Sequence, residues 1–371
     1  MPTNKSIHIV SFDVPYPANY GGVQDVYFKI EQFKNLGYKV YLHCFQYKSE
    51  KKPQILNELC DKVFYYKRNL IWSNFSLLPH IVLSRKNASL LKNLTEINAP
   101  ILFEGIHCSY YLKADSLKDR IKYLRLHNIE YKYYNNLRIL ETKLWKKLYF
   151  YIESIKLKFY DKNVKYANKI VVINQTEQLY YQKKYPLLDV EILPALFNLK
   201  VDLKSGTGKY VLFHGNLEVI DNIKSAEYII KNIASSLSLP LIISGKNPSK
   251  NLLKICDENS IKCIANPSNE VLLELIQNAQ VNLLYSFMND GSKLKLFNVL
   301  SSGRFCVANN NVISSDNFTS NTVFVANTES EIIKTVNQIS SLIFNSENII
   351  KRNDLLNSIR EEITLSFRRI F

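Results

Sequence analysis

The feature that most constrains the fold is an alternation of short β-branched and aromatic runs with longer segments of helical periodicity, which continues along most of the 371 residues. This pattern is typical of parallel sheets covered by helices. Apolar residues at helical spacing and a stop at Gly37 predict a helix over 23–37, and residues 129–167 are also predicted to be helical. Strands are predicted at 7–14, 39–45, 63–67, 101–105, 122–127, 169–174 and 190–194. The first half is therefore predicted to be a Rossmann-like domain.

A polar segment at 198–209 separates this half from a second half of the same kind. It holds two of the ten glycines, which favours a linker. Further strands are predicted at 210–215, 239–245, 261–266, 281–285, 305–309 and 323–327. Helical patterns at 329–344 and 355–371 close the chain, and the last could pack back onto the first domain. We therefore expect an α/β chain of two Rossmann-like domains, 1–200 and 205–350, with a ligand-binding cleft between the carboxyl ends of their sheets.

Composition and cysteine usage narrow the class of protein. Hydrophobic residues make up 46% and charged residues 22%, as in a folded globular chain. The six cysteines form no CxxC pair and have no zinc-like spacing with histidine, so we interpret them as reduced thiols of a cytoplasmic protein. The N-terminus lacks the apolar core of a signal peptide. The uncharged stretch 69–84 is too short to span a membrane, which takes ~20 apolar residues.

The net charge of +15 is concentrated in the first half. Residues 1–195 contain 30 Lys and Arg against 17 Asp and Glu, whereas residues 196–371 contain 18 against 16. Within 113–184 the basic residues are interleaved with tyrosines. Together with 69–84, this region is predicted to dock peripherally on an anionic membrane, although a solvated basic face is the alternative. Nucleic-acid binding is not expected, because no RNP, KH or zinc-finger pattern occurs.

Two segments carry ligand-binding chemistry. The loop PYPANYGG (15–22) places Gly21 and Gly22 between the first strand and the first helix, where a backbone without Cβ atoms can approach a ligand. The segment FMNDGSKLKLFNVLSSGRFCVAN (287–309) predicts a polar turn and a helix with Lys293 and Lys295 in its first turn. Cations are unfavourable at a positively charged helix end, so this placement suggests an anionic ligand such as a diphosphate. Surface lysines on an amphipathic helix remain the alternative.

The chain resembles the family 4 glycosyltransferases of GT-B fold, in particular a bacterial subgroup of sugar transferases. The resemblance covers most of the chain and is carried by the glycine-pair loop, LRLHNIEYKYY (124–134), FHGNLEVIDN (213–222), SGKNPS (244–249) and DGSKLKLFNVLSSGR (290–304). It implies that the second domain binds a nucleotide-diphosphate sugar and the first binds the acceptor.

The resemblance also implies roles for individual residues. Asp290 stands at the first acid position of the family's Glu-x7-Glu pattern, but Asn298 replaces the second acid. Asn222 stands where many members have a lysine, for which Lys246 or Arg304 could compensate. The predicted catalytic residues are His107, Asp290 and Lys295. The predicted donor-binding residues are His214, Gly215, Asn216, Lys246, Gly291, Ser292, Lys293, Asn298 and Arg304. The predicted acceptor-binding residues are Gly21, Gly22, Glu104 and His127.

His107 and His127 each follow a predicted strand, and a packed or hydrogen-bonded structural histidine is the alternative for both.

Several motifs that would indicate other chemistry are missing from the sequence. No DxD occurs, so we expect protein cations and helix dipoles, without a metal or another cofactor, to neutralise the diphosphate. No P-loop or GxSxG motif indicates a kinase or a hydrolase.

We therefore predict a hexosyltransferase with a glycan or lipid-linked acceptor. The resemblance implies that the transfer retains the anomeric configuration of the sugar, and it favours mannose as the transferred hexose. A sugar-nucleotide epimerase and a non-catalytic nucleotide-sugar or polyanion-binding protein remain alternatives.

Overall fold

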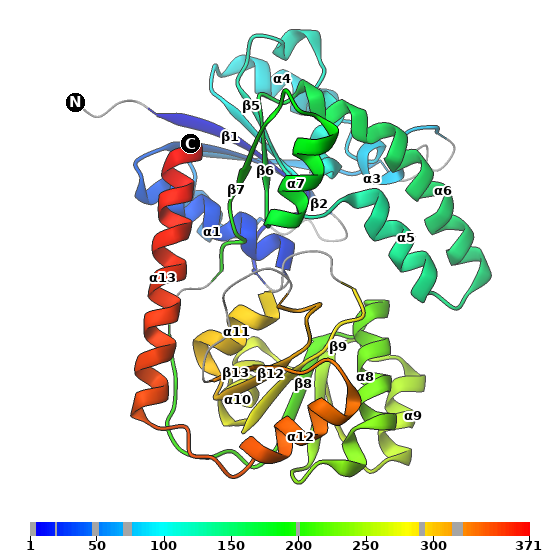
Figure 1. The fold of residues 1–371 in the computed structure, drawn as a ribbon. Coiled ribbons are helices and arrows are strands. Elements are labelled where there is room, and N and C mark those ends of the chain that lie inside the picture. Colours follow the sequence, from blue (N-terminus) through cyan, green and yellow to red (C-terminus); the bar gives the residue numbers. More distant parts are fainter. Residues whose placement is uncertain are drawn as a thin grey trace. The chain divides into compact units, whose positions relative to one another are not determined.

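The computed structural model describes residues 5–18, 21–46, 52–69, 76–197, 201–288, 294–313 and 322–371. The chain divides into two compact units. The first comprises Met1–Phe197 and Ser366–Phe371, and the second comprises Asn198–Leu365. Each unit is built on its own parallel sheet flanked by helices, which confirms the predicted α/β class (Figure 1).

The first sheet has seven parallel strands in the order β3-β2-β1-β4-β5-β6-β7. The strands are β1 (Ser6–Ser11), β2 (Lys39–Gln46), β3 (Lys62–Lys67), β4 (Ile101–Glu104), β5 (Lys122–Arg125), β6 (Lys169–Val172) and β7 (Asp189–Ile192). β1 and β4 are almost entirely buried. Helices cover both faces of a parallel sheet, which is why its strands are continuous apolar runs. The strand order reverses direction between β1 and β4, so the carboxyl ends of these strands form the topological switch point of the sheet.

Helices connect these strands. They are α1 (Gly21–Asn35), α2 (Gln54–Leu59), α3 (His80–Leu83), α4 (Ala88–Glu96), α5 (Glu130–Leu140), α6 (Leu144–Tyr160) and α7 (Gln175–Lys184), with 3-10 turns η2 (Ile106–Tyr111), η3 (Asp115–Leu117) and η4 (Asp161–Tyr166). The region predicted as one helical stretch over 129–167 is divided between α5, α6 and η4. The Glu141 carboxylate accepts hydrogen bonds from the backbone N–H groups of Thr142 and Lys143, at 2.8 and 3.0 Å, and these bonds stabilise the turn between α5 and α6.

The second unit has a six-stranded parallel sheet in the order β10-β9-β8-β11-β12-β13. Its strands are β8 (Val211–Asn216), β9 (Leu241–Lys246), β10 (Lys262–Ala265), β11 (Val281–Leu284), β12 (Phe305–Ala308) and β13 (Val323–Val325). Its helices are α8 (Ile220–Asn232), η5 (Ala234–Ser236), α9 (Lys250–Glu258), α10 (Asn269–Asn278), α11 (Leu294–Ser302), α12 (Glu329–Ile339) and α13 (Ser346–Ile370). The switch point of this sheet lies between β8 and β11.

The end of α13 is part of the first unit's core. The rings of Phe367 and Phe371 pack edge-on against Phe33 of α1, with centroids 4.6 and 4.9 Å away. The Tyr38 hydroxyl donates a hydrogen bond of 2.6 Å to the carbonyl of Phe371. Within the described residues, no helix combines the length and the hydrophobicity of a membrane span.

Two neutral histidines are buried between β1 and β2. His8 Nδ1 lies 2.9 Å from His43 Nε2, and His43 Nδ1 lies 2.8 Å from the Tyr66 hydroxyl. His8 Nε2 lies 3.0 Å from the carbonyl of Ile97. Burial lowers the pKa of His8 to about 4, and it lowers the pKa of His43 well below its ordinary value of 6.5. Both side chains are therefore neutral in the folded protein at physiological pH.

This pair predicts acid destabilisation. The unfolded chain takes up protons on both histidines near pH 6.5 while the folded chain does not, so their contribution to stability is complete above pH 6.5 and falls below it. Below the unfolded pKa, each histidine lowers the free energy of unfolding by about 1.4 kcal/mol per pH unit. At pH 5.5 the two together lower it by roughly 3 kcal/mol. Urea unfolding at pH 7.5 and 5.5 measures this difference. His43→Gln should about halve it, and an unchanged difference would contradict the assignment.

Candidate active site

The first candidate site lies at the switch point of the first sheet. β1, β4 and β5 are parallel neighbours, so their carboxyl ends share one edge. Glu104 is the last residue of β4, His107 lies in η2 just beyond it, and His127 follows β5 by two residues. Three of the predicted site residues are therefore placed at the edge where parallel α/β sheets bind ligands.

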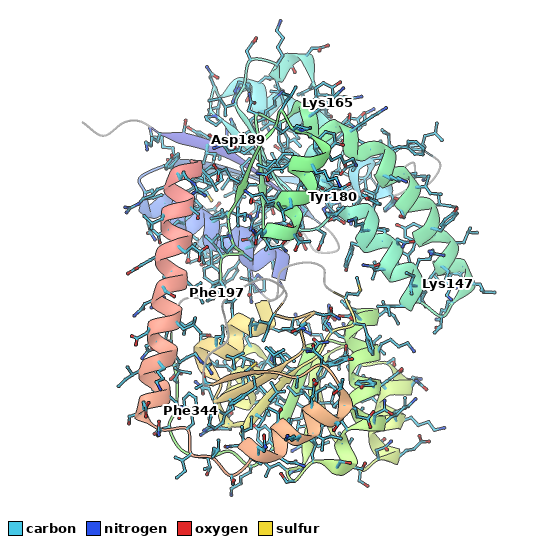
Figure 2. All side chains as sticks on the ribbon, viewed as in Figure 1. Lys147, Lys165, Tyr180, Asp189, Phe197 and Phe344 are labelled. Carbon is cyan, nitrogen blue, oxygen red and sulfur yellow. The ribbon has the colours of Figure 1, made fainter. Side chains whose placement is uncertain are left out.

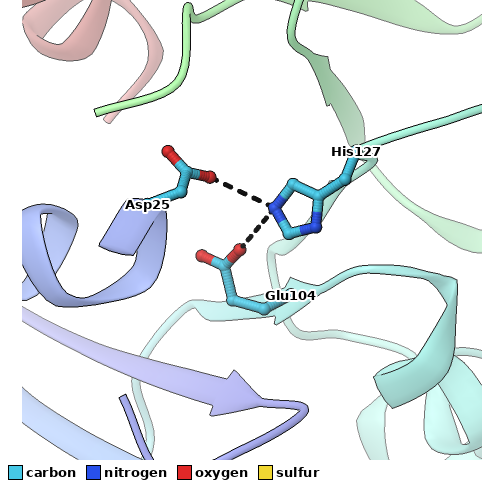
Figure 3. Close-up of side chains that lie close together, drawn as sticks. All are labelled: Asp25, Glu104 and His127. Atoms are coloured by element: carbon cyan, nitrogen blue, oxygen red, sulfur yellow. Dashed lines mark hydrogen bonds and ion pairs between the residues drawn. The ribbon is translucent and has the colours of Figure 1, made fainter. Parts of the chain in front are cut away.

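A buried ion cluster joins two of these residues to α1 (Figure 3). The Nε2 atom of His127 lies 3.1 Å from Asp25 Oδ2 and 3.5 Å from Glu104 Oε2. The Nζ atom of Lys29 lies 2.7 Å from Asp25 Oδ2 and 2.8 Å from Glu104 Oε1, and Arg125 Nε lies 3.2 Å from Asp25 Oδ2. All these side chains except His127 are fully buried. Two carboxylates are thus balanced by one ammonium and one guanidinium.

The cluster keeps both carboxyl groups ionised. Burial favours the neutral acid at Asp25, but the charges of Arg125 and Lys29 outweigh it and hold the pKa of Asp25 well below its usual value. Burial likewise opposes ionisation of Glu104, and Lys29 chiefly accounts for its lowered pKa. Asp25 Oδ1 also accepts a hydrogen bond of 2.8 Å from the backbone N–H of Leu196. The carboxylate therefore ties α1 to the segment that follows β7.

The cluster has the composition of a metal site but not its charge balance. Asp25, Glu104 and His127 present three ligand atoms within 4.8 Å of one another. The ammonium of Lys29 lies against both carboxylates, and the guanidinium of Arg125 contacts one of them. Both cations would repel a divalent ion at this point. We therefore interpret the group as an internally neutralised cluster and assign it no metal.

The cluster fixes the orientation of His127. Burial favours a neutral imidazole, but the hydrogen bonds with Asp25 and Glu104 outweigh it and raise the pKa of His127. Because Nε2 faces the two carboxylates, it carries a proton, and Nδ1 is the atom left to exchange a hydrogen bond or a proton with a ligand. His127 is partly exposed, with 12% of its side chain accessible. A histidine held by buried carboxylates in this way can act as a general acid or base.

His107 has a different environment. Burial, followed by the positive charges of Arg85 and His127, lowers its pKa well below the ordinary value. Its Nδ1 atom is buried and has no hydrogen-bond partner among the described residues. Gly105, which directly precedes η2, has a φ of 74°, and a Cβ atom there would lie 2.8 Å from His107 Nδ1, so a larger residue would be strained. The catalytic role of His107 stays a prediction.

Phe12 lies beside these histidines. Its ring centroid is 5.6 Å from that of His107 and 5.7 Å from that of His127. Gly21 and Gly22 open α1, and a Cβ atom on Gly22 would lie 2.6 Å from the Phe12 ring. Gly22 therefore allows the start of α1 to pack closely on Phe12, and acceptor binding by the two glycines stays a prediction.

The second candidate site lies at the switch point of the second sheet. His214, Gly215 and Asn216 are the last three residues of β8, and Asn216 pairs with Lys246 at the end of β9. Lys295, in the first turn of α11, donates a hydrogen bond of 2.7 Å from Nζ to Asn222 Oδ1. Asn222 in turn donates to the carbonyl of Asn216, at 2.8 Å.

The charges around His214 give this site a cationic character. Burial and then the charge of Lys295 lower the pKa of His214 to about 3, so its imidazole is neutral. Its Nε2 atom is buried and has no hydrogen-bond partner among the described residues. Lys295 lies at the helix end where the N–H dipoles are positive. The end of β8 and the start of α11 thus combine a neutral imidazole with an ammonium, a combination suited to an anionic ligand.

Asp221, at the start of α8, anchors the neighbouring loop. Its carboxylate accepts hydrogen bonds from the Ser286 hydroxyl at 2.7 Å and from the backbone N–H of Phe287 at 2.8 Å. The loop after β11 is thereby held against α8. Nothing in the sequence patterns singled out this residue.

The other predicted site residues of the second unit have different outcomes. Asp290, predicted to be catalytic, and Gly291, Ser292 and Lys293, predicted to bind the donor, lie outside the described residues. Asn298 is partly exposed on α11. Arg304 is buried, and its Nη1 atom donates to the carbonyls of Gln277 and Ala279, so this side chain ties β12 to the end of α10. Donor binding by these residues stays a prediction.

Sequence patterns did not point to Asp25, which contacts His127, or to Lys29 and Arg125, which pair with the Asp25 carboxylate. The sequence of α1 did contain a sign of a buried ion pair. Asp25 and Lys29 are four residues apart, on the same side of the helix as the apolar residues Val26 and Ile30. Charged residues on the buried face of a helix are almost always paired. Arg125 is likewise a buried charged residue, at the end of β5.

Comparison with known proteins supports this architecture. No family model matches the chain. An uncharacterized 44.6 kDa protein in the cps region of Klebsiella pneumoniae is 27% identical to it over 321 residues, which cover 81% of this chain and 82% of that protein. Among solved structures, sucrose-phosphate synthase from Thermosynechococcus elongatus has a TM-score of 0.70 at 10% identity and covers 99% of this chain and 98% of its own. The protein HepE of Anabaena, solved with UDP and glucose, has a TM-score of 0.64 at 12% identity, with the same coverage.

TarM, with a TM-score of 0.67 at 12% identity, covers 99% of this chain and 98% of its own. These neighbours are GT-B glycosyltransferases with two parallel-sheet domains. The chain has the GT-B fold. Two sheets with a switch point each are what this fold requires, so the predicted fold is confirmed. Membership of the family 4-like subgroup stays a prediction.

Proposed function

We propose that the protein is a glycosyltransferase that transfers a hexose from a nucleotide-diphosphate sugar to an acceptor. The main support is that a chain of GT-B fold carries chemically competent side chains at the switch points of both sheets. The second unit offers an ammonium at a helix N-terminus, and the first offers a histidine oriented by two carboxylates. The resemblance to family 4 enzymes implies Lys295 as a residue of the donor site and His127 as a residue of the acceptor site.

The second unit is proposed to bind the nucleotide diphosphate. Lys295 and the N-terminal dipole of α11 would stabilise the negative charge that develops on the leaving group, so this proposal requires no metal. His214, which is neutral, can donate a hydrogen bond to a phosphate oxygen or a sugar hydroxyl without a change of protonation. Retention of configuration and mannose as the hexose follow from the resemblance alone.

The first unit is proposed to bind the acceptor. His127 would orient the acceptor hydroxyl or take its proton, and the buried carboxylates would hold the imidazole in place. These carboxylates are inaccessible and already paired, so they are poor candidates for the acid and base of an epimerase. The relative from the cps region supports a glycan or lipid-linked acceptor.

The proposed function is tested by release of nucleotide from UDP, GDP, ADP and CMP sugars in the presence of a bacterial lipid extract. Acceptor-dependent release and incorporation of the sugar into the acceptor are expected with one donor. Interconversion of sugar nucleotides without release would instead indicate an epimerase. Binding of a sugar nucleotide without either reaction would indicate the non-catalytic alternative.

Lys295→Ala is expected to weaken nucleoside-diphosphate binding by roughly 10- to 150-fold, because a charge-assisted hydrogen bond contributes about 1.5–3 kcal/mol. Stability should change little, since the substitution also removes a cation from a positive helix end. Calorimetric titration measures the affinity. Asn298→Ala, on the same helix, should lower it less, by one neutral hydrogen bond of about 0.5–1.5 kcal/mol, and only for ligands with a ribose. Unchanged diphosphate affinity in folded Lys295→Ala would contradict the proposed donor site.

A further inference from the structure

An apolar face of α6 is exposed to solvent. It consists of Leu144, Trp145, Leu148, Tyr151, Ile152, Ile155 and Phe159, and we call this set the α6 face. Its members recur at spacings of one, three and four residues, so they lie along one side of the helix. Leu144 is 82% exposed, Phe159 71% and Trp145 67%. Isolated exposed apolar residues are ordinary, but a continuous row of seven marks an interaction surface.

The other side of α6 is packed in the first unit, where α6 runs beside α5 (Figure 1). Glu153, Leu157 and Tyr160 are buried there. The Glu153 carboxylate accepts a hydrogen bond of 2.7 Å from the backbone N–H of His80, and the Ser154 hydroxyl donates one of 2.8 Å to the carbonyl of Tyr131. The helix is therefore held in a fixed orientation, and the exposure of its apolar face is part of the folded structure.

The charges around the α6 face are positive. Residues 143–165 contain seven lysines and two acidic residues. Both acids are buried and paired, Glu153 with Lys156 at 2.9 Å and Asp161 with Lys184 at 2.6 Å. Lys147 lies near the turn between α5 and α6, and Lys165 lies beyond the other end of α6 (Figure 2). The apolar row is thus accompanied along its length by ammonium groups without exposed acids on the same segment.

We propose that the α6 face docks on an anionic lipid surface, with its apolar side chains at the level of the headgroups and its lysines against lipid phosphates. Apolar and aromatic side chains with flanking lysines are the pattern of helices that lie in the plane of the interface. Lysine stems can extend along the apolar surface and keep their ammonium groups at the phosphates. A second copy of the chain fits less well, because a symmetric contact would bring two rows of lysines together.

Co-sedimentation of the full chain with vesicles tests this surface. Binding to phosphatidylcholine vesicles that contain phosphatidylglycerol is expected to exceed binding to pure phosphatidylcholine and to weaken as salt increases. Lys147→Gln and Lys158→Gln should each lower the partition coefficient about five-fold. Trp145→Ser and Phe159→Ser should each lower it about ten-fold or more, because each removes a large apolar group from the interface.

Matched controls lie elsewhere on the chain. Leu187→Ser changes a residue of the first unit that is 99% exposed and outside α6, and Lys231→Gln changes a lysine of the second unit. Neither should alter vesicle binding. Circular dichroism checks folding, and Leu144→Ser replaces any α6 variant that unfolds. Equal pelleting of the α6 variants and the controls would overturn the proposal. A dimer in sedimentation velocity that Trp145→Ser abolishes would also overturn it, because the face would then bind a second copy.

Fluorescence tests the same surface without sedimentation or enzyme activity. The chain contains two tryptophans, so Trp72→Phe leaves Trp145 as the reporter. Its emission should shift to the blue and be quenched by brominated lipids when anionic vesicles are added. Emission that does not change on vesicle binding would place the α6 face away from the lipid and overturn the proposal.

Discussion

Asp25→Ala is expected to destabilise the first unit by about 3–5 kcal/mol, the range typical for removal of one partner of a buried ion pair. The substitution leaves the Lys29 ammonium with one carboxylate and the Arg125 guanidinium without its carboxylate contacts, both away from solvent. It also removes the acceptor of the Leu196 backbone N–H. Urea unfolding followed by far-UV circular dichroism measures the loss, which should appear in the transition of the first unit.

Two further variants show how much of the lost stability comes from the charge of Asp25 and how much depends on its burial. Asp25→Asn retains a hydrogen-bond acceptor of similar size but not the charge, so its stability should lie between that of the wild type and that of Asp25→Ala. Glu96→Ala removes an exposed carboxylate that lies 3.8 Å from Lys92 and should change stability by less than about 1 kcal/mol. A loss below about 1 kcal/mol for Asp25→Ala would mean that water or a rearranged side chain replaces the carboxylate, and that the cluster does not maintain the site.

Most elements of the fold could be predicted because their signals are local. The run predicted as a strand at 39–45 is β2, Lys39–Gln46, and the run at 63–67 is β3, Lys62–Lys67. The break between α5 and α6 could not be predicted in this way, because the apolar periodicity continues across it. The interruption depends on the Glu141 carboxylate, which accepts hydrogen bonds from backbone N–H groups and offers the chain an alternative to the helix.

The candidate site was only partly accessible to sequence reasoning. Glu104 and His127 could be selected because each stands at or just beyond the end of a predicted strand, where α/β sheets bind ligands. The contact between His127 and Asp25 could not be predicted, because the two positions are 102 residues apart in the chain. Such a contact depends on the order of strands in the sheet and on the side of the sheet that α1 covers. Local patterns along the chain encode neither.

His127→Ala is expected to lower kcat by about 10²–10⁴-fold, the usual effect of removing a general acid or base, if the proposed transfer reaction is correct. Stability should fall at the same time, because Asp25 and Glu104 each lose a hydrogen bond. Rates must therefore be compared at a temperature where unfolding measurements show both proteins to be folded. His107→Ala is the companion variant, and a larger loss of kcat there would transfer the catalytic role to His107.

The pH profile distinguishes a catalytic His127 from a merely structural one. The raised pKa of His127 places the acid limb of activity above the ordinary value of 6.5 if the neutral imidazole is the active form. The same shift stabilises the fold below pH 6.5, and this contribution is lost as pH rises through the folded pKa. Glu104→Gln removes one of the charges that favour the protonated form, so it should move the acid limb to lower pH. A limb that stays in place would show that another group titrates there, whereas a shift would link the buried carboxylates to turnover through the imidazole that they orient.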